Sequence, residues 1–235
     1  MIDLLKFIFP HNLTCSLCGS QLDLNYDKPL CQICLGSLQY ISDPSCMICG
    51  KLLSRKRAFS VCETCIILDR AVDRGTSLWI YDDFIKPLIY KYKYKGHTYL
   101  YEYFATCLIN RLVALDLPFE IDRIIPVPCH PRRRKRRGYD PVGGLCRALS
   151  KKTGLVLDDH LVRVYHTPKL HGEDACSRAK ILESAFTYKG ELSGTVLLVD
   201  DIYTTGHTMN FCAKALKAAG ADYVVSISLC VGSDQ

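Results

Sequence analysis

The sequence has no apolar run long enough to cross a lipid bilayer, because charged residues or prolines interrupt its longest apolar stretches. Its first ten residues are apolar, but they contain Asp3 and Lys6, and no cleavage site of small residues follows them. We therefore interpret this start as a segment that packs against the protein and not as a signal peptide. Together these absences predict a protein without membrane insertion.

A strong charge imbalance is also missing. The formal net charge is +6, and residues 1–70 carry 7 basic against 6 acidic residues, which leaves +5 for the remainder. A polyanionic partner is compatible with this excess, but the excess does not prove one. With 235 residues and 49% hydrophobic residues, the chain can form one α/β domain plus a small module, which excludes global disorder. We expect the module at 1–70 and the larger domain at 71–235.

The fourteen cysteines lack the pattern of a secreted disulfide protein. Eight of them form four Cys-x-x-Cys pairs, and the second two pairs repeat the first two after a shift of 31 residues: Cys15, Cys18, Cys31 and Cys34, then Cys46, Cys49, Cys62 and Cys65. Such pairs in a chain without a secretion signal are typical of zinc sites in a reducing compartment, so we expect a cytoplasmic protein.

A duplicated unit this short cannot bury enough surface to fold alone, and it needs a metal to stabilise it. The simplest assignment is one structural zinc ion for each set of four cysteines, in a double zinc ribbon. Pairing of the first and third Cys-x-x-Cys units, redox dithiols and an iron–sulfur cluster are the alternatives. We expect the other six cysteines to be small core residues: Cys107, Cys129, Cys146, Cys176, Cys212 and Cys230.

Apolar periodicity predicts an α/β fold after residue 70. Strand, loop, helix and strand follow one another near the C-terminus, which makes a βαβ unit with parallel strands covered on both faces. The expected strands are 76–81, 121–127, 195–199 and 223–231, and the expected helices are 99–115, 144–151 and 206–219.

The loop between the strand at 195–199 and the helix at 206–219 predicts a phosphate site. Asp200 and Asp201 end the strand, at the edge where parallel sheets bind ligands. A helix N-terminus favours an anion, Gly206 lets the backbone approach it, and the threonines add hydroxyl groups. The two acidic side chains can accept hydrogen bonds from a ribose diol or help to hold Mg²⁺. The alternative is an ordinary capped turn, which one Asp and one Thr would already explain.

The segment Val199–Thr208 resembles the signature of type I phosphoribosyltransferases. The resemblance implies a mostly parallel sheet flanked by helices. It also implies that Asp200 and Asp201 bind the ribose hydroxyls of phosphoribosyl pyrophosphate. The 5′-phosphate would bind the loop formed by Thr204, Thr205, Gly206, His207 and Thr208.

The whole chain resembles the ComF family of competence proteins. The four Cys-x-x-Cys pairs, Pro126-Val127-Pro128, a basic stretch, Arg137-Gly138-Tyr139 and the phosphate loop occur in the family's order. This resemblance implies a cytoplasmic role in DNA uptake, with single-stranded DNA and DNA-uptake proteins as partners.

The chain departs from the family pattern in two places. Tyr139-Asp140-Pro141 stands where Phe-Asn-Gln is usual. Thr167, Arg178, Ala185 and Phe186 fit the pattern further on, but Leu170 and Ile181 replace the expected Gln and Asn. Loss of these polar groups favours ligand binding without transferase chemistry.

Two further segments are rich in cations. Lys91-Tyr92-Lys93-Tyr94-Lys95 alternates cations with rings, which suits single-stranded nucleic acid or, alternatively, an edge strand; Lys95 is also a candidate pyrophosphate ligand. The run Arg132–Arg137, with Arg137 as a ligand candidate, predicts a pyrophosphate-binding loop, a solvated loop or a DNA contact.

Three functions therefore remain open. The first is a ComF-like protein that binds phosphoribosyl pyrophosphate with Mg²⁺ and handles single-stranded DNA. The second is a phosphoribosyltransferase of salvage or amido type, in which Asp200 and Asp201 would be the catalytic pair. The third is a ligand sensor or DNA-binding module without turnover.

Overall fold

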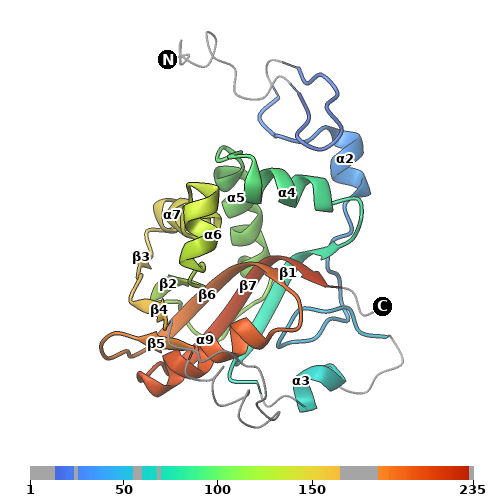
Figure 1. Ribbon diagram of the computed structural model, residues 1–235. Coiled ribbons are helices and arrows are strands. Elements are labelled where there is room, and N and C mark those ends of the chain that lie inside the picture. Colours follow the sequence, from blue (N-terminus) through green and yellow to red (C-terminus); the bar gives the residue numbers. More distant parts are fainter. Residues whose placement is uncertain (1–13, 24–25, 55–59, 68–69, 165–184, 233–235) are drawn as a thin grey trace, which may run out of the picture.

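The computed structural model describes residues 14–23, 26–54, 60–67, 70–164 and 185–232. A sheet of five parallel strands, in the order β1-β7-β6-β2-β3, forms its centre (Figure 1). This confirms the predicted mostly parallel sheet. The strands are β1 (Arg74–Tyr81), β2 (Arg123–Pro126), β3 (Val156–Leu157), β6 (Thr195–Tyr203) and β7 (Tyr223–Gly232).

The sheet is buried on both faces because its central strands are apolar on both sides. Residues 195–199 of β6 and residues 224–231 of β7 are all buried. One face packs against α4 (Lys86–Tyr94), α5 (Leu100–Val113) and α7 (Pro141–Thr153), and the other against α9 (His207–Ala218) (Figure 1). In the part of the chain that the structure describes, no helix combines the length and apolar character needed to span a bilayer.

The smaller elements lie around this core. Two strands, β4 (Leu161–Arg163) and β5 (Phe186–Tyr188), pair antiparallel near α9. The ribbons contribute the short helices α2 (Gln32–Ser37) and α3 (Glu63–Ile67), and α6 (Pro131–Arg137) follows β2.

Two segments that we interpreted as strand or loop are helical. The alternative of an edge strand at Lys91–Lys95 is wrong, because residues 91–94 belong to α4 and Lys95 is its C-cap. Within this helix Tyr92 is fully buried while Tyr90 and Tyr94, one turn apart, share the exposed side. The loop expected at Arg132–Arg137 is likewise the helix α6.

Proline marks the start of both of these helices. Pro87 and Pro131 each occupy the first turn, where the missing backbone N–H costs nothing. Gly138 then ends α6 in the left-handed conformation, with φ of 78°, and its N–H donates to the carbonyl oxygen of Arg134.

The two ribbons dock at different places on the larger domain. Cys15 and Cys34 of the first ribbon belong to the core on the side of α4 and α5, whereas the four cysteines of the second belong to the core around α9. The residues between them, 39–41, run antiparallel to β1: Ile41 N–H donates to Leu78 O, and Ile80 N–H donates to Gln39 O, each at 2.9 Å. The two ribbons therefore pack on opposite sides of the sheet, and the segment that connects them runs along the edge strand β1.

Candidate functional site

A cavity of about 240 Å³ lies at the carboxyl ends of β2 and β6, where the sequence predicted the ligand. Its polar wall comes from elements far apart in the chain. The charged and hydroxyl side chains that line it are Lys93, Arg133, Arg137, Asp140, Arg163, Asp200, Asp201, Thr204 and Thr208. The predicted acidic pair and the predicted phosphate loop thus meet in one cavity with a set of cations.

The acidic pair is held in place by a lysine from α4. Lys93 Nζ lies 2.8 Å from Asp201 Oδ1, and the two side chains are only 14% and 12% exposed. Asp200 Oδ1 accepts a hydrogen bond from the backbone N–H of Asp201 at 2.8 Å. One carboxylate is therefore neutralised by a partly buried cation, while the other faces the cavity with one backbone partner.

Asp200 is hard to ionise in this setting. Asp200 is partly exposed to the cavity, but protein atoms surround its carboxyl group. This burial raises the pKa of Asp200 well above the usual value. The charge of Asp201 raises it further. A ligand that brings a cation or hydrogen-bond donors to this carboxylate would relieve both effects.

The phosphate loop has the geometry that favours an anion. Gly206 precedes α9 in the left-handed conformation, with φ of 75°, and no side chain caps the helix. A Cβ atom on Gly206 would lie against the ring and hydroxyl group of Tyr203, so no other residue fits without displacing that ring. The first N–H groups of α9 therefore remain for an anion beside the hydroxyl groups of Thr204 and Thr208.

The other predicted ligands take different positions. Thr205 and His207 interact with each other, with His207 Nδ1 2.8 Å from Thr205 Oγ1, and neither lines the cavity. Arg137 does line it. Lys95 lies outside it, with Nζ 5.9 Å from the centre of the Tyr90 ring.

Several cavity residues were not identified from the sequence as its ligands. Lys93 was considered only for nucleic acid, and Cys129 was expected in the core, although it is partly exposed and lines the cavity. Burial raises the pKa of Cys129, which keeps it a thiol. The signal for Cys129 was its place after Pro-Val-Pro at a strand end. No local pattern indicated that Lys93 or Arg163 lines the cavity.

The remaining family positions are only partly within the described residues. Ala185 and Phe186 are buried at the start of β5. Residues Thr167, Leu170, Arg178 and Ile181, together with Cys176, lie outside the described part of the chain.

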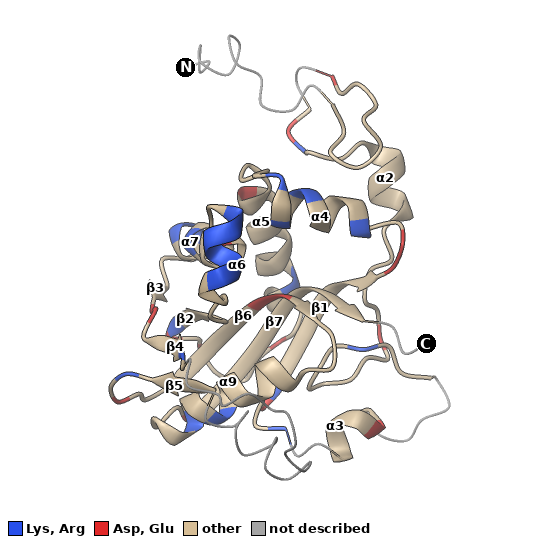
Figure 2. Cartoon of the chain, viewed as in Figure 1, with Lys and Arg blue, Asp and Glu red and all other residues tan. Residues whose placement is uncertain are grey.

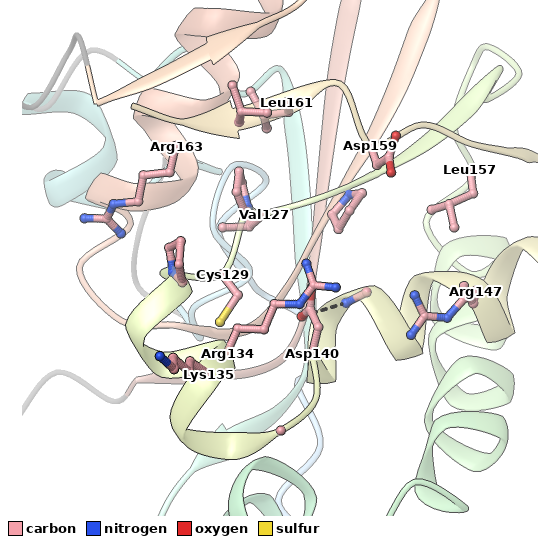
Figure 3. Close-up of a pocket in the computed structure, with 16 residues that line it drawn as sticks. Val127, Cys129, Arg134, Lys135, Asp140, Arg147, Leu157, Asp159, Leu161 and Arg163 are labelled. Carbon is pink, nitrogen blue, oxygen red and sulfur yellow. Dashed lines mark hydrogen bonds between the residues drawn. The ribbon is translucent and has the colours of Figure 1, made fainter. Parts of the chain in front are cut away.

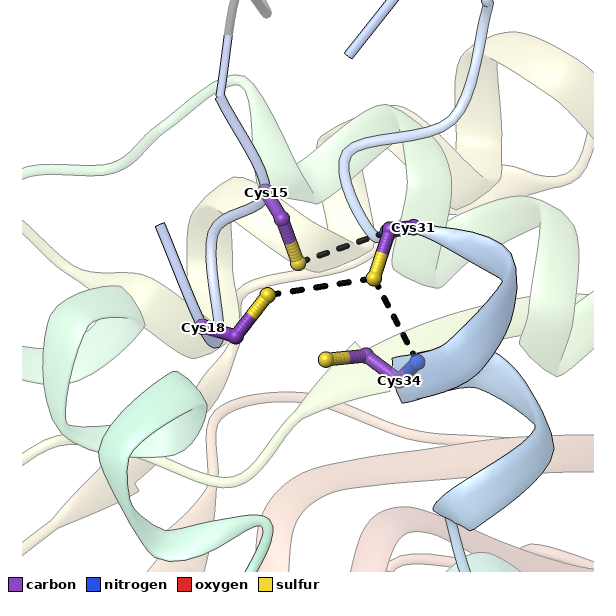
Figure 4. A group of neighbouring side chains, drawn as sticks. All are labelled: Cys15, Cys18, Cys31 and Cys34. Carbon is purple, nitrogen blue, oxygen red and sulfur yellow. Dashed lines mark hydrogen bonds between the residues drawn. The ribbon is translucent and has the colours of Figure 1, made fainter. Parts of the chain in front are cut away.

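The eight paired cysteines form two clusters with the simplest predicted pairing (Figure 4 shows the first). Within each cluster the four sulfur atoms lie within 4.8 Å of one another. Cys18 and Cys31 Sγ are 3.8 Å apart, and Cys49 and Cys62 Sγ are 3.7 Å apart. Tetrahedral zinc with bonds of about 2.3 Å requires sulfur atoms about 3.8 Å apart. Both clusters therefore fit structural zinc ions.

The second cluster contacts Tyr203, the residue just before the phosphate loop. The hydroxyl group of Tyr203 lies against Cys65, and burial raises the pKa of this tyrosine. Just after the ribbon, Arg70 Nη2 donates to the carbonyl oxygen of Thr205 at 2.6 Å, and Ala71 N–H donates to Asn210 Oδ1 at 2.7 Å. The loop is thus fixed at its start, at its tip and in the first turn of α9.

Lys and Arg residues are frequent on α4 and α6 (Figure 2), and α4 also carries the exposed rings of Tyr90 and Tyr94. The rings of Tyr90 and Tyr94 have centroids 5.1 Å apart, and the guanidinium of Arg137 lies 4.4 Å from the Tyr94 centroid. The ammonium group of Lys95 lies over the Tyr90 ring. We call this row, Lys95–Tyr90–Tyr94–Arg137, the tyrosine ladder; it ends at the cavity through Arg137.

Known sequences similar to this chain bear on its identity. A family profile described as a double zinc ribbon domain matches residues 4–66. The chain is 24% identical to competence protein ComFC of Bacillus subtilis, over 92% of the chain and 93% of that protein. Identity is 29% with competence protein F of Haemophilus influenzae, covering 91% and 94%. It is 28% with the DNA utilization protein YhgH of Escherichia coli, covering 92% and 96%.

Two solved structures overlap the chain in part. A glutamine phosphoribosylpyrophosphate amidotransferase from B. subtilis, complexed with ADP and GMP, gives a TM-score of 0.41 at 16% identity, over 59% of this chain and 30% of that one. A UMP synthase from Leishmania donovani gives 0.34 at 17%, over 67% and 26%.

Proposed function

We propose that this chain is a member of the ComF family of competence proteins, binds phosphoribosyl pyrophosphate or a related ribose phosphate, and acts in DNA uptake. The names of its relatives support the role in competence. One observation supports the ligand: the acidic pair, the uncapped start of α9 and three arginines line the same cavity.

The cavity offers a partner for each part of this ligand. The 5′-phosphate would bind the first N–H groups of α9, with Thr204 and Thr208. Asp200 and Asp201 would accept the hydrogen bonds of the ribose diol, with Mg²⁺ offsetting their charge. Arg133 and Arg137 would face the pyrophosphate, because guanidinium groups match phosphate oxygens in pairs.

Thr208→Val is expected to weaken binding of phosphoribosyl pyrophosphate with Mg²⁺ about tenfold, because a hydrogen bond to a charged group contributes about 1.5–3 kcal/mol. Isothermal titration calorimetry would measure this. Thr106→Val is the matched control, since Thr106 is exposed on α5, does not line the cavity, and donates its hydroxyl hydrogen bond to the Glu102 carbonyl oxygen. Equal affinities in wild type and Thr208→Val would contradict the phosphate assignment.

Single-stranded DNA is the second proposed ligand, and the tyrosine ladder supports it. Tyr90 and Tyr94 are 52% and 41% exposed, and cations flank them. Bases stack on such rings without sequence preference while cations follow the backbone.

Tyr90→Ala combined with Tyr94→Ala is expected to weaken binding of an oligothymidylate at least tenfold, because stacking contributes about 1–3 kcal/mol per base. Fluorescence anisotropy at several salt concentrations would measure it. Tyr223→Ala is the control, since Tyr223 is similarly exposed (46%) but begins β7 at the opposite end of the sheet. If both variants bind DNA like the wild type, the ladder is not the DNA site.

Turnover would define a different function. Release of pyrophosphate from phosphoribosyl pyrophosphate in the presence of bases or amines would support a phosphoribosyltransferase of salvage or amido type. Ligand and DNA binding without release would support a sensor or handling role in the cytoplasm.

A further inference from the structure

The helix α6 divides its cations between two cavities. Arg133 and Arg137, one turn apart, line the 240 Å³ cavity described above. Arg134 and Lys135 turn to the other side and line a second cavity of about 650 Å³. Arg132 and Arg136 line neither. The basic run therefore serves two sites, which its sequence alone does not reveal.

The second cavity lies where β2, β3 and β4 end or begin, next to α6 and α7 (Figure 3). Part of its wall is apolar: Val127 and Leu161 are buried, and Leu157 is partly buried. Its volume is within the range of about 300–1,000 Å³ found for small-molecule sites. It could accommodate far more than a single inorganic anion.

The polar part of the wall attracts anions. Four cations line it, Arg134, Lys135, Arg147 and Arg163, against two carboxylates. Of these cations, the first three form no ion pair with any residue that the structure describes. Asp140 accepts a hydrogen bond from Gly143 N–H at 3.1 Å and caps α7, so its carboxylate already has a structural role. Asp159 is exposed at the rim.

The geometry points to a binding site for a nucleotide in this second cavity. Arg134, Lys135 and Arg147 would bind its phosphate, the apolar wall would contact the face of its base, and Asp159 would accept from an exocyclic amino group. The two cavities adjoin, so the nucleotide would lie beside the proposed phosphoribosyl ligand; both are lined by Val127, Pro128, Cys129, Asp140 and Arg163. The nucleotide is free or is the 5′-terminal residue of a DNA strand; both carry the same phosphate and base.

The inference does not require ligand in the first cavity, so binding of dAMP to the full-length, zinc-loaded protein tests it. Arg134→Ala combined with Arg147→Ala is expected to weaken dAMP binding at least tenfold in calorimetry and to change phosphoribosyl pyrophosphate affinity less than twofold. Arg136→Ala is the matched control, because it removes the same charge from the same helix without touching either cavity. It should leave dAMP affinity within twofold of wild type.

Three results would overturn the site. The first is an equal loss of dAMP affinity in the double variant and in Arg136→Ala. The second is inorganic phosphate that binds as tightly as dAMP. The third is dAMP that competes with phosphoribosyl pyrophosphate and binds the double variant with unchanged affinity. A 5′-phosphorylated oligothymidylate and its 5′-hydroxyl form separate the two sources. If Arg134 and Arg147 strengthen binding only of the phosphorylated strand, the site holds a strand end. If they affect dAMP alone, it holds a free nucleotide.

Discussion

Replacing both Cys62 and Cys65 with serine is expected to weaken phosphoribosyl pyrophosphate binding at least a hundredfold. These cysteines belong to the second metal cluster, and Cys65 contacts the hydroxyl group of Tyr203 just before the phosphate loop. Structural zinc in small modules contributes about 10–16 kcal/mol of apparent binding energy, which is folding energy. Without it, the segment that carries Arg70 has no fixed position, and the loop loses its contact at Thr205.

The control is the same pair of changes in the first ribbon, Cys31→Ser and Cys34→Ser. That ribbon docks on α4 through Ser16, whose carbonyl oxygen accepts from Lys91 Nζ at 2.7 Å, and none of its described residues lines the cavity. Each double variant should lose one zinc ion by mass spectrometry, but only the change in the second ribbon should reduce affinity a hundredfold. Equal affinities in the two variants would show that the second cluster has no particular role at the loop.

Arg70→Ala separates the loop contact from the metal. This variant should retain two zinc ions, and its melting temperature should stay within a few degrees of the wild type. Its affinity for phosphoribosyl pyrophosphate should nevertheless fall about tenfold, as expected for one lost hydrogen bond near a charged ligand. Unchanged affinity in this variant would place the effect of the cysteine changes on global folding.

Substitutions in the acidic pair are expected to have the second large effect, because they should lower ligand affinity while raising the stability of the ligand-free protein. Asp200→Asn combined with Asp201→Asn is expected to weaken phosphoribosyl pyrophosphate binding at least a hundredfold, because both acceptors for the ribose diol and for Mg²⁺ are altered. Asp200→Asn alone is expected to stabilise the ligand-free protein by about 1 kcal/mol, or roughly 2–4 °C in melting temperature. A neutral amide avoids both the buried charge and the repulsion from Asp201.

The pH dependence follows from the same carboxyl group. Its pKa in the folded protein is well above that of the unfolded chain, so the folded state holds the proton more tightly. The contribution of Asp200 to the stability of the ligand-free protein therefore falls as the pH rises above about 4, the ordinary pKa of aspartate. Asp200→Asn should remove that part of the decline in thermal melts. The exposed Asp83→Asn is the control, and a decline that is equally steep in both variants would rule out Asp200 as its cause.

Strands β1, β2, β6 and β7, and the position of the loop after β6, could be predicted because each depends on local sequence. The apolar run Thr195–Val199 buries every residue, and the acidic pair follows it directly. Likewise, the duplicated cysteine spacing was sufficient for the ligand sets of both clusters. These features need no information about distant parts of the chain.

Other features depend on tertiary structure or on weak local signals. In Lys91–Lys95, alternating cations and rings fit a strand as well as a helix, and only packing buries Tyr92 between α5 and α7. Pro87 and Pro131 were the available evidence for helix starts. The ion pair between Lys93 and Asp201 joins residues 108 positions apart, so no local pattern could indicate it.

The antiparallel contact of residues 39–41 with β1 has a consequence for any shortened form of the protein. A fragment that begins after the second ribbon would leave N–H and C=O groups of β1 exposed along a strand that is mostly buried in the whole protein. Unpaired strands of this kind recruit other chains and lead to aggregation. The cysteine-rich module therefore protects the larger domain from self-association, in addition to holding metal.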